Sequence, residues 1–163
     1  MELHNPGSEI FVPDGLAADK ALARTTHMCI AAHQDDIEIM AYHGILECFG
    51  KDDQHFTGVT VTNGAGSPRD GLYARYTDDE MQKVRRLEQK KAAFVGEYSA
   101  QVFLDYTSGA VKSSANKDVI EDIKKITSAA KPKVIYTHNP ADKHDTPLNE
   151  GDTLAFMLLL AGG

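Results

Sequence analysis

Short apolar runs alternate along this chain with longer segments whose apolar residues recur every three or four positions. We expect strands where the runs are short and mostly apolar, at 26–32, 102–104 and 134–137. We also expect a strand at 56–62, which is rich in β-branched residues. We expect helices over 37–49, 77–96 and 116–131, where capping residues and stop signals bound the periodic segments. Such alternation produces right-handed crossovers between parallel strands. The sequence therefore predicts an α/β fold with a mainly parallel, doubly wound sheet.

The length of the chain fits one domain. A domain of 163 residues buries roughly two-thirds of the surface that its unfolded chain exposes, so it forms a core without cross-links. Residues 1–24 are polar and rich in turn signals, and we expect them to form an N-terminal extension with a short helix over 16–23. Residues 25–163 are expected to form the domain itself.

Charge and composition exclude several classes of partner. The formal net charge is −7 and Lys and Arg form no long run, so we expect no nucleic-acid partner. The longest apolar stretch, 154–161, is far shorter than the roughly 20 residues of a membrane-spanning helix, so no membrane span is expected. The N-terminus lacks the basic start and apolar middle of a signal peptide. Cys29 and Cys48 are expected to be reduced thiols of a cytoplasmic protein.

Polar segments follow three of the expected strands, at 33–38, 63–75 and 138–145. Loops at the carboxyl edge of a parallel sheet converge in space, and ligands bind there. The sequence therefore predicts one crevice lined by side chains that are about a hundred residues apart. Its candidate metal-binding and catalytic residues are His33, Asp35, Asp36, His138, Asp142, His144 and Asp145.

The types of these residues suit zinc, which binds imidazole nitrogen and carboxylate oxygen. His33 and Asp36 are three residues apart in a strand-to-helix turn, so both are expected to face one ion. Asp35 would point elsewhere and accept a proton from a bound water. A catalytic zinc site uses three protein ligands, and a third ligand is still needed.

Two segments have other interpretations. Asp35 or Asp36 would also cap a helix and favour its dipole, and Asn139–Asp142 is a good turn sequence. The glycines of 63–66 would suit a phosphate cradle, but no helix opens directly from that loop. We interpret the loop instead as one that shapes a substrate pocket.

In that loop, Arg69 or Arg75 would reach into the pocket, or either would be solvated.

Several motifs, in this order, resemble the PIG-L/LmbE-like deacetylases over most of residues 25–146. They are Ala32-His33-Gln34-Asp35-Asp36-Ile37-Glu38, followed by the segments 59–64, 85–88, 103–106 and 137–145. The resemblance implies a Rossmann-like three-layer α/β/α fold, a zinc ion, and hydrolysis of the acetamide of N-acetylglucosamine derivatives. Carried over by position, His33 and Asp36 would be metal ligands and Asp35 the general base. His144 would polarise the substrate carbonyl and stabilise the oxyanion.

The chain departs from this family at two positions. Gln34 stands where proline is usual, which alters the rigidity of the turn. Pro147 stands where the third zinc ligand is expected, and proline has no side chain that binds a metal. His138 or a solvent molecule would then fill the vacant position. Two further hypotheses are a non-catalytic sugar- or metal-binding module with the same fold, and an α/β domain whose acids and histidines only cap helices.

Residues 147–163 show no likeness to the family, so we expect a fold shortened at its C-terminus. The apolar side chains of 154–160 must be covered. They would form an ordinary core helix capped by Asp152 or Thr153, or pack against another subunit in a homo-oligomer.

Overall fold

The computed structural model describes residues 1–113 and 115–138. The strands are β1 (Glu9–Phe11), β2 (His27–Ala31), β3 (Phe56–Thr62), β4 (Ala100–Tyr106) and β5 (Val134–Thr137). The helices are α1 (Ala18–Ala23), α2 (Asp36–Met40), α3 (Tyr42–Cys48), α4 (Asp78–Val95), α5 (Ser108–Lys112) and α6 (Asp118–Ala130), with a 3₁₀ turn at Gly71–Tyr73.

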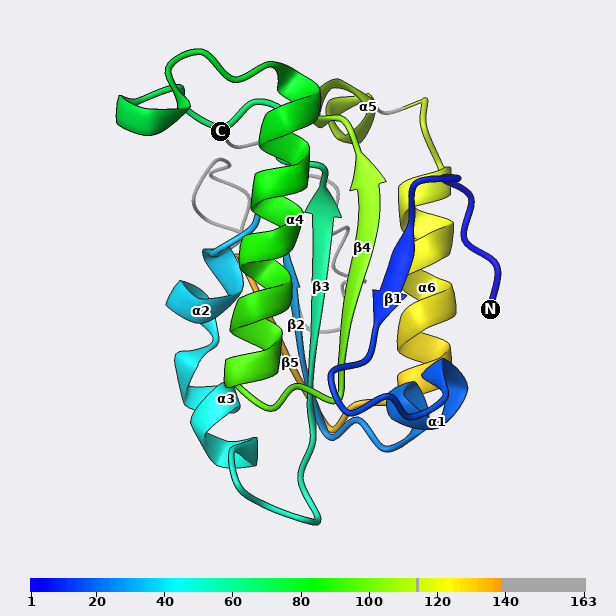
Figure 1. Cartoon of the computed structure of the whole chain (residues 1–163). Coiled ribbons are helices and arrows are strands. Elements are labelled where there is room, and N and C mark those ends of the chain that lie inside the picture. The colour runs from blue at the N-terminus through cyan, green and yellow to red at the C-terminus, as the bar shows by residue number, and fades with distance from the viewer. Residues whose placement is uncertain (114, 139–163) are drawn as a thin grey trace, which may run out of the picture.

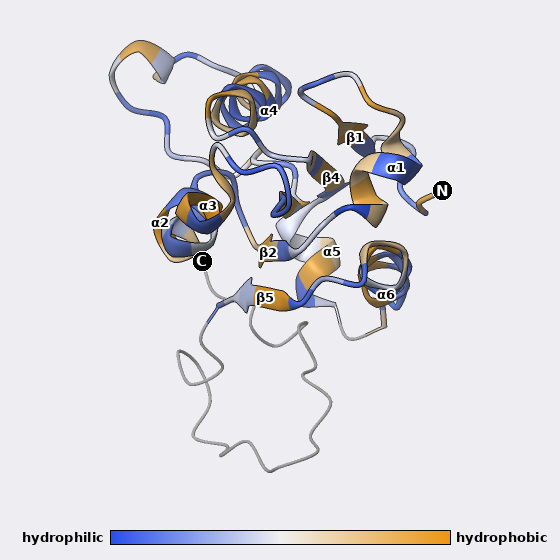
Figure 2. Ribbon diagram, turned by 90° about the horizontal axis from the view of Figure 1, so that it is seen from below, coloured by the Kyte–Doolittle hydropathy of each residue, from blue (hydrophilic) through white to orange (hydrophobic). Residues whose placement is uncertain are grey.

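One five-stranded sheet has the order β1-β4-β3-β2-β5. β2, β3, β4 and β5 are parallel, and β1 pairs antiparallel with β4 at the edge. Helices α2, α3 and α4 cover one face, while α1, α5 and α6 lie on the other (Figures 1 and 2). The structure thus confirms the predicted α/β fold with a mainly parallel sheet flanked by helices.

Each face of the sheet has its own apolar core, because successive side chains of a strand point to opposite faces. Along β2, Met28 and Ile30 belong to the core that packs against α1 and α6. Cys29 and Ala31 belong to the core that contains Ile37 of α2 and residues of α3. Burial on both faces explains why this strand is a continuous apolar run in the sequence.

The main difference from the expected elements lies in the segment 37–49. It is two helices rather than one, because Ala41 leaves the helical conformation with φ −113° and ψ 21°. The backbone hydrogen bonds from Ala41 to Ile37 and from Ile45 to Ala41 continue through the bend. Apolar side chains on both sides of the break, such as Ile37 and Ile45, therefore still reach the same core.

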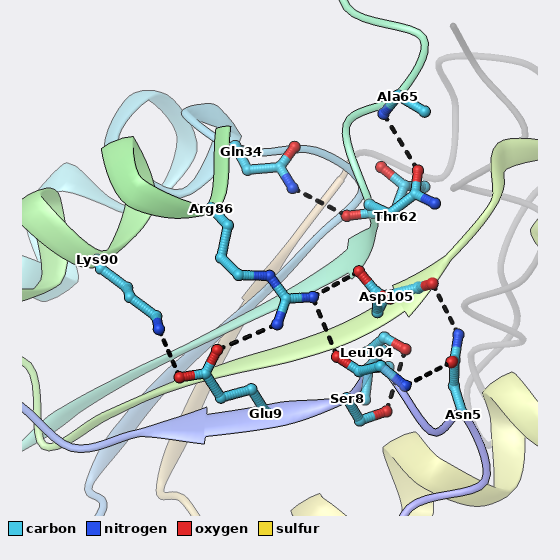
Figure 3. Close-up of polar contacts among 12 residues, drawn as sticks. Asn5, Ser8, Glu9, Gln34, Thr62, Ala65, Arg86, Lys90, Leu104 and Asp105 are labelled. Carbon is cyan, nitrogen blue, oxygen red and sulfur yellow. Dashed lines mark hydrogen bonds and ion pairs between the residues drawn. The ribbon is translucent and has the colours of Figure 1, made fainter. Parts of the chain in front are cut away.

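Two short elements are additional to those expected. β1 has three half-buried residues and α5 has five residues, which is too short for a clear periodic signal. Polar contacts fasten the N-terminal segment to the sheet and to α4 (Figure 3). Asn5 donates to the Asp105 carbonyl oxygen, and Glu9 accepts from Arg86 and Lys90.

The described residues include both cysteines and the helices α1–α6, so they bear on the expectations about thiols and membrane spans. Cys29 and Cys48 are both free and buried, as expected. Among the helices within residues 1–113 and 115–138, none combines the length and apolar character needed to cross a bilayer.

The order of the sheet fixes where a ligand site forms. From β2 the chain moves to β3 and β4 on one side, and after α6 it returns to place β5 on the other side of β2. The strand order therefore reverses between β2 and β5, and in such sheets the crevice at the carboxyl ends of these strands binds ligands. Residues 32–36 follow β2 at this edge, and His138 follows β5.

Candidate active site

The turn that leaves β2 folds back on itself at Asp36. The backbone N–H of His33 donates to Asp36 Oδ2 at 2.8 Å, and His33 Nδ1 lies 3.3 Å from the same oxygen. Asp35, the residue before α2, makes no side-chain capping bond to the helix. The Asp36 carboxylate bonds upstream to His33. Neither acid therefore caps α2 through a side-chain hydrogen bond, although Asp36 lies in the first turn of the helix as expected.

Asp36 also meets the strand on the other side of the switch point. Its Oδ2 lies 3.4 Å from His138 Nε2, so the loops after β2 and β5 do meet. Burial tends to raise the pKa of the Asp36 carboxyl, but the neighbouring His138 and His33 outweigh it and hold this pKa well below its usual range. Asp36 is therefore a carboxylate anion with imidazoles on two sides.

His138 has a structural contact at the nitrogen that faces the site. Its Nε2 accepts a hydrogen bond from the Ala32 backbone N–H at 2.9 Å. This bond fastens the end of β2 to the end of β5. That His138 fills the vacant ligand position stays a prediction.

Asp35 lies apart from this cluster and pairs with a cation. Its Oδ2 accepts from Arg85 Nη2 at 2.7 Å, and the Asp35 side chain is 63% exposed. The same Nη2 donates to the Gln34 carbonyl oxygen at 2.7 Å. Burial lowers the pKa of the Arg85 guanidinium, but its contacts with Asp35 and Glu88 raise this pKa by more than burial lowers it. Arg85 is therefore positively charged.

Arg85 belongs to the segment 85–88, which carries part of the family resemblance, but the sequence indicated no role for it at the site. The available signal was its place on the amphipathic helix 77–96, but nothing in the sequence showed which loop that helix meets.

A pocket of about 500 Å³ opens at this edge of the sheet. It is lined by His33, Asp35, Asp36, Thr62, Gly64, Gly66, Ser67, Pro68, Arg85, Ser108 and Lys112. The three candidate residues of the first motif thus share one concave surface with the glycine-containing loop after β3. That loop does shape the pocket.

The two arginines of this loop do not line the pocket. Arg69 donates to the carbonyl oxygens of Ala65 and Ser67 and pairs with Asp78 at the start of α4, so it holds the loop together. Arg75 is exposed. The expectation that Arg69 reaches inward is therefore wrong, since its guanidinium is used within the loop.

Gly64 lies where the loop after β3 packs tightly against Gln34 and Arg85. Its φ is +78°, and a Cβ at this position would lie 2.7 Å from Gln34 Oε1 and 2.9 Å from Arg85 Cβ. Gln34, which replaces the usual proline, donates through Nε2 to the Thr62 carbonyl oxygen at 3.0 Å (Figure 3). A hydrogen bond to the end of β3 thus restrains the turn where a proline ring otherwise would.

The donor set fits zinc in type but is incomplete within the described chain. His33 and Asp36 supply one imidazole and one carboxylate, both of which zinc accepts. Residues 1–113 and 115–138 hold no group of three or more His, Cys, Asp or Glu placed to bind one metal ion. His144, Pro147 and the acids Asp142 and Asp145 lie outside the described residues.

Fold and site together define an α/β domain with a polar, carboxylate-containing pocket at the point where the strand order reverses. Residues 28–147 match the family described as PIG-L: GlcNAc-PI de-N-acetylase, and the chain belongs to this family. The predicted family is thereby confirmed. No curated protein and no solved structure matches the chain significantly. Membership implies a de-N-acetylase, and the family is typically zinc-dependent.

Proposed function

We propose that this protein is a metal-dependent hydrolase that removes the acetyl group from an N-acetylglucosamine-type or similar amide substrate. The observation that carries the proposal is that His33, Asp35 and Asp36 line one pocket at the switch point of a PIG-L family domain. A pocket of about 500 Å³ falls in the size range of small-molecule sites, roughly 300–1,000 Å³.

In this proposal His33 and Asp36 hold a zinc ion. Their side chains are adjacent, and the low pKa of Asp36 keeps the carboxylate ionised and ready to bind a cation. When bound, zinc supplies positive charge that polarises a carbonyl oxygen and lowers the pKa of water. The third position would be filled by His138, whose Nε2 lies 3.4 Å from Asp36 Oδ2, or by a solvent molecule.

Asp35 is the proposed general base. It faces the same pocket but bonds to neither His33 nor Asp36, so its carboxylate is proposed to take a proton at Oδ1, the oxygen that does not bond to Arg85. Arg85 fixes the direction of that carboxylate through Oδ2. His144 is the proposed group that polarises the substrate carbonyl and stabilises the oxyanion.

The test is to purify the full chain without chelator and measure its zinc content together with amine release from N-acetylglucosamine. We expect stoichiometric zinc in the wild type, loss of zinc in His33→Ala, and retained zinc with lost amine release in Asp35→Asn. His43→Ala is the matched control, because this exposed histidine on α3 lies outside the pocket. A wild type that binds no zinc and releases no amine would overturn the proposal.

A further inference from the structure

The peptide group between Gln34 and Asp35 is held at both ends by one helix. Its carbonyl oxygen accepts from Arg85 Nη2 at 2.7 Å, and its N–H donates to Gln89 Oε1 at 3.0 Å. Arg85 and Gln89 are four residues apart on α4, so they share one face of that helix. Because a peptide group is planar, fixing both of its polar atoms fixes its orientation.

This orientation is one that a residue with a side chain rarely adopts. Asp35 has φ +78°, in the left-handed region. Such a conformation persists where surrounding contacts determine it, and it is found often at functional sites. The bond from Asp35 N–H to Gln89 acts directly on the side of the peptide that sets φ of Asp35.

The hydrogen bonds of the Gln89 side-chain amide determine where its oxygen and its nitrogen point. Gln89 is 1% exposed, and its Nε2 donates to Glu38 Oε1 at 2.8 Å. The Tyr98 hydroxyl donates to the same Glu38 oxygen at 2.7 Å. A carboxylate only accepts and a backbone N–H only donates, so the amide oxygen must face Asp35 and the amide nitrogen must face Glu38.

We propose that Gln89 is a positioning residue, which sets the left-handed backbone of Asp35 and thereby aims the Asp35 carboxylate into the pocket. Gln89 is not among the described residues that line this pocket. The inference rests on the proposed function for its catalytic consequence. Its structural content, the bond between Gln89 and the Asp35 N–H, is testable without activity.

The experiment compares Gln89→Met with the wild type and with Gln101→Met in the full chain. Gln101 is a matched control, because it is also fully buried and donates to Thr60 Oγ1 and the Val102 carbonyl oxygen, away from Asp35. The first readout is hydrogen exchange of the Asp35 amide by NMR without metal. We expect exchange at least about tenfold faster in Gln89→Met and unchanged in Gln101→Met.

The second readout is amine release from N-acetylglucosamine with zinc supplied. Misplacing Asp35 without touching substrate lowers kcat and leaves KM alone, so we expect kcat to fall at least about tenfold with KM within about twofold in Gln89→Met. Gln101→Met should keep kcat within about twofold, because it leaves the contacts of Asp35 in place. A loss of kcat caused only by the loss of a buried amide would instead appear in both variants. Equal kcat values in the two variants would overturn the positioning role.

If Gln89→Met does not fold, Gln89→Asn replaces it, because a side chain shorter by one methylene cannot reach Asp35 N–H and Glu38 together. The same directions are expected. A wild type without amine release would refute the proposed function alone, and the inference would then be decided by amide exchange. Unchanged exchange of the Asp35 amide in both Gln89 variants would refute the inference, whatever the activity.

Discussion

The Arg85 guanidinium donates a hydrogen bond to the Asp35 carboxylate across 2.7 Å, although the two residues are 50 positions apart in the chain. Helix α4 therefore reaches the turn after β2 and contributes to the pocket as well as to the core. The pair gives little net stability by itself, because the Asp35 side chain is 63% exposed and the solvent screens the interaction. Its value lies in direction, since it leaves the carboxylate with one preferred orientation.

Replacing Arg85 should therefore affect turnover more than folding. In Arg85→Met we expect kcat for amine release to fall about tenfold, because the Asp35 carboxylate and the Gln34 carbonyl oxygen both lose their donor. The free energy of unfolding should fall by about 1 kcal/mol. Kinetics and urea denaturation measure the two effects. Arg75→Met, at an exposed arginine outside the pocket, should change neither, and an equal loss there would contradict the prediction.

Gly64 should tolerate no side chain. Gly64→Ala combines a positive φ with contacts to Gln34 and Arg85 that are too short, so we expect a loss of about 2–4 kcal/mol in unfolding free energy. Gly66→Ala is the control in the same loop, because a Cβ there would meet nothing within 4 Å. It should change stability by less than about 0.5 kcal/mol. Equal urea midpoints for the two variants would show that Gly64 is not the point of close approach.

A substitution at position 147 distinguishes the proposed enzyme from a non-catalytic binding module. If Pro147 deprives the proposed zinc site of its third ligand, Pro147→His should raise zinc affinity and amine release from N-acetylglucosamine together. Competition with a chromogenic chelator measures the affinity. Unchanged zinc affinity in Pro147→His would show that position 147 supplies no ligand. Intact zinc binding without any gain in turnover would favour a non-catalytic module.

The two cysteines should resist labelling in the folded protein. Burial raises the pKa of the Cys29 thiol to about 12 and also raises that of Cys48, so neither forms much of the reactive thiolate at neutral pH. We expect almost no reaction with a thiol reagent in native buffer and reaction of both residues in denaturant. Fast labelling of native protein would contradict the burial of these two side chains.

Much of the fold was predictable because its strands leave short runs of apolar or β-branched residues in the sequence. β2, β4 and β5 each contain an apolar run, and β3 is rich in β-branched residues. The capping box at Thr77 marks the start of α4. The break at Ala41 was not predictable from periodicity, because the apolar spacing is the same on both sides of it. β1 and α5 are too short to leave a pattern.

The site was predictable only where its residues are close in sequence. His33, Asp35 and Asp36 form one local motif. Loops at the carboxyl edge of a parallel sheet converge, so the sequence also predicted that the loops after β3 and β5 lie near this motif. Arg85 and Gln89 were missed because their partners are about 50 residues away. A glutamine on a helix is usually solvated, so Gln89 gave no signal that it is buried and bonded at both ends of its amide.

The left-handed backbone of Asp35 also governs which substitutions report on chemistry alone. Asparagine adopts a positive φ more readily than most residues and has nearly the same shape, so Asp35→Asn removes the charge while the turn persists. An alanine or a branched side chain there would strain the backbone that also places Asp36. Loss of activity in such a variant would reflect a displaced metal ligand as much as a missing proton acceptor.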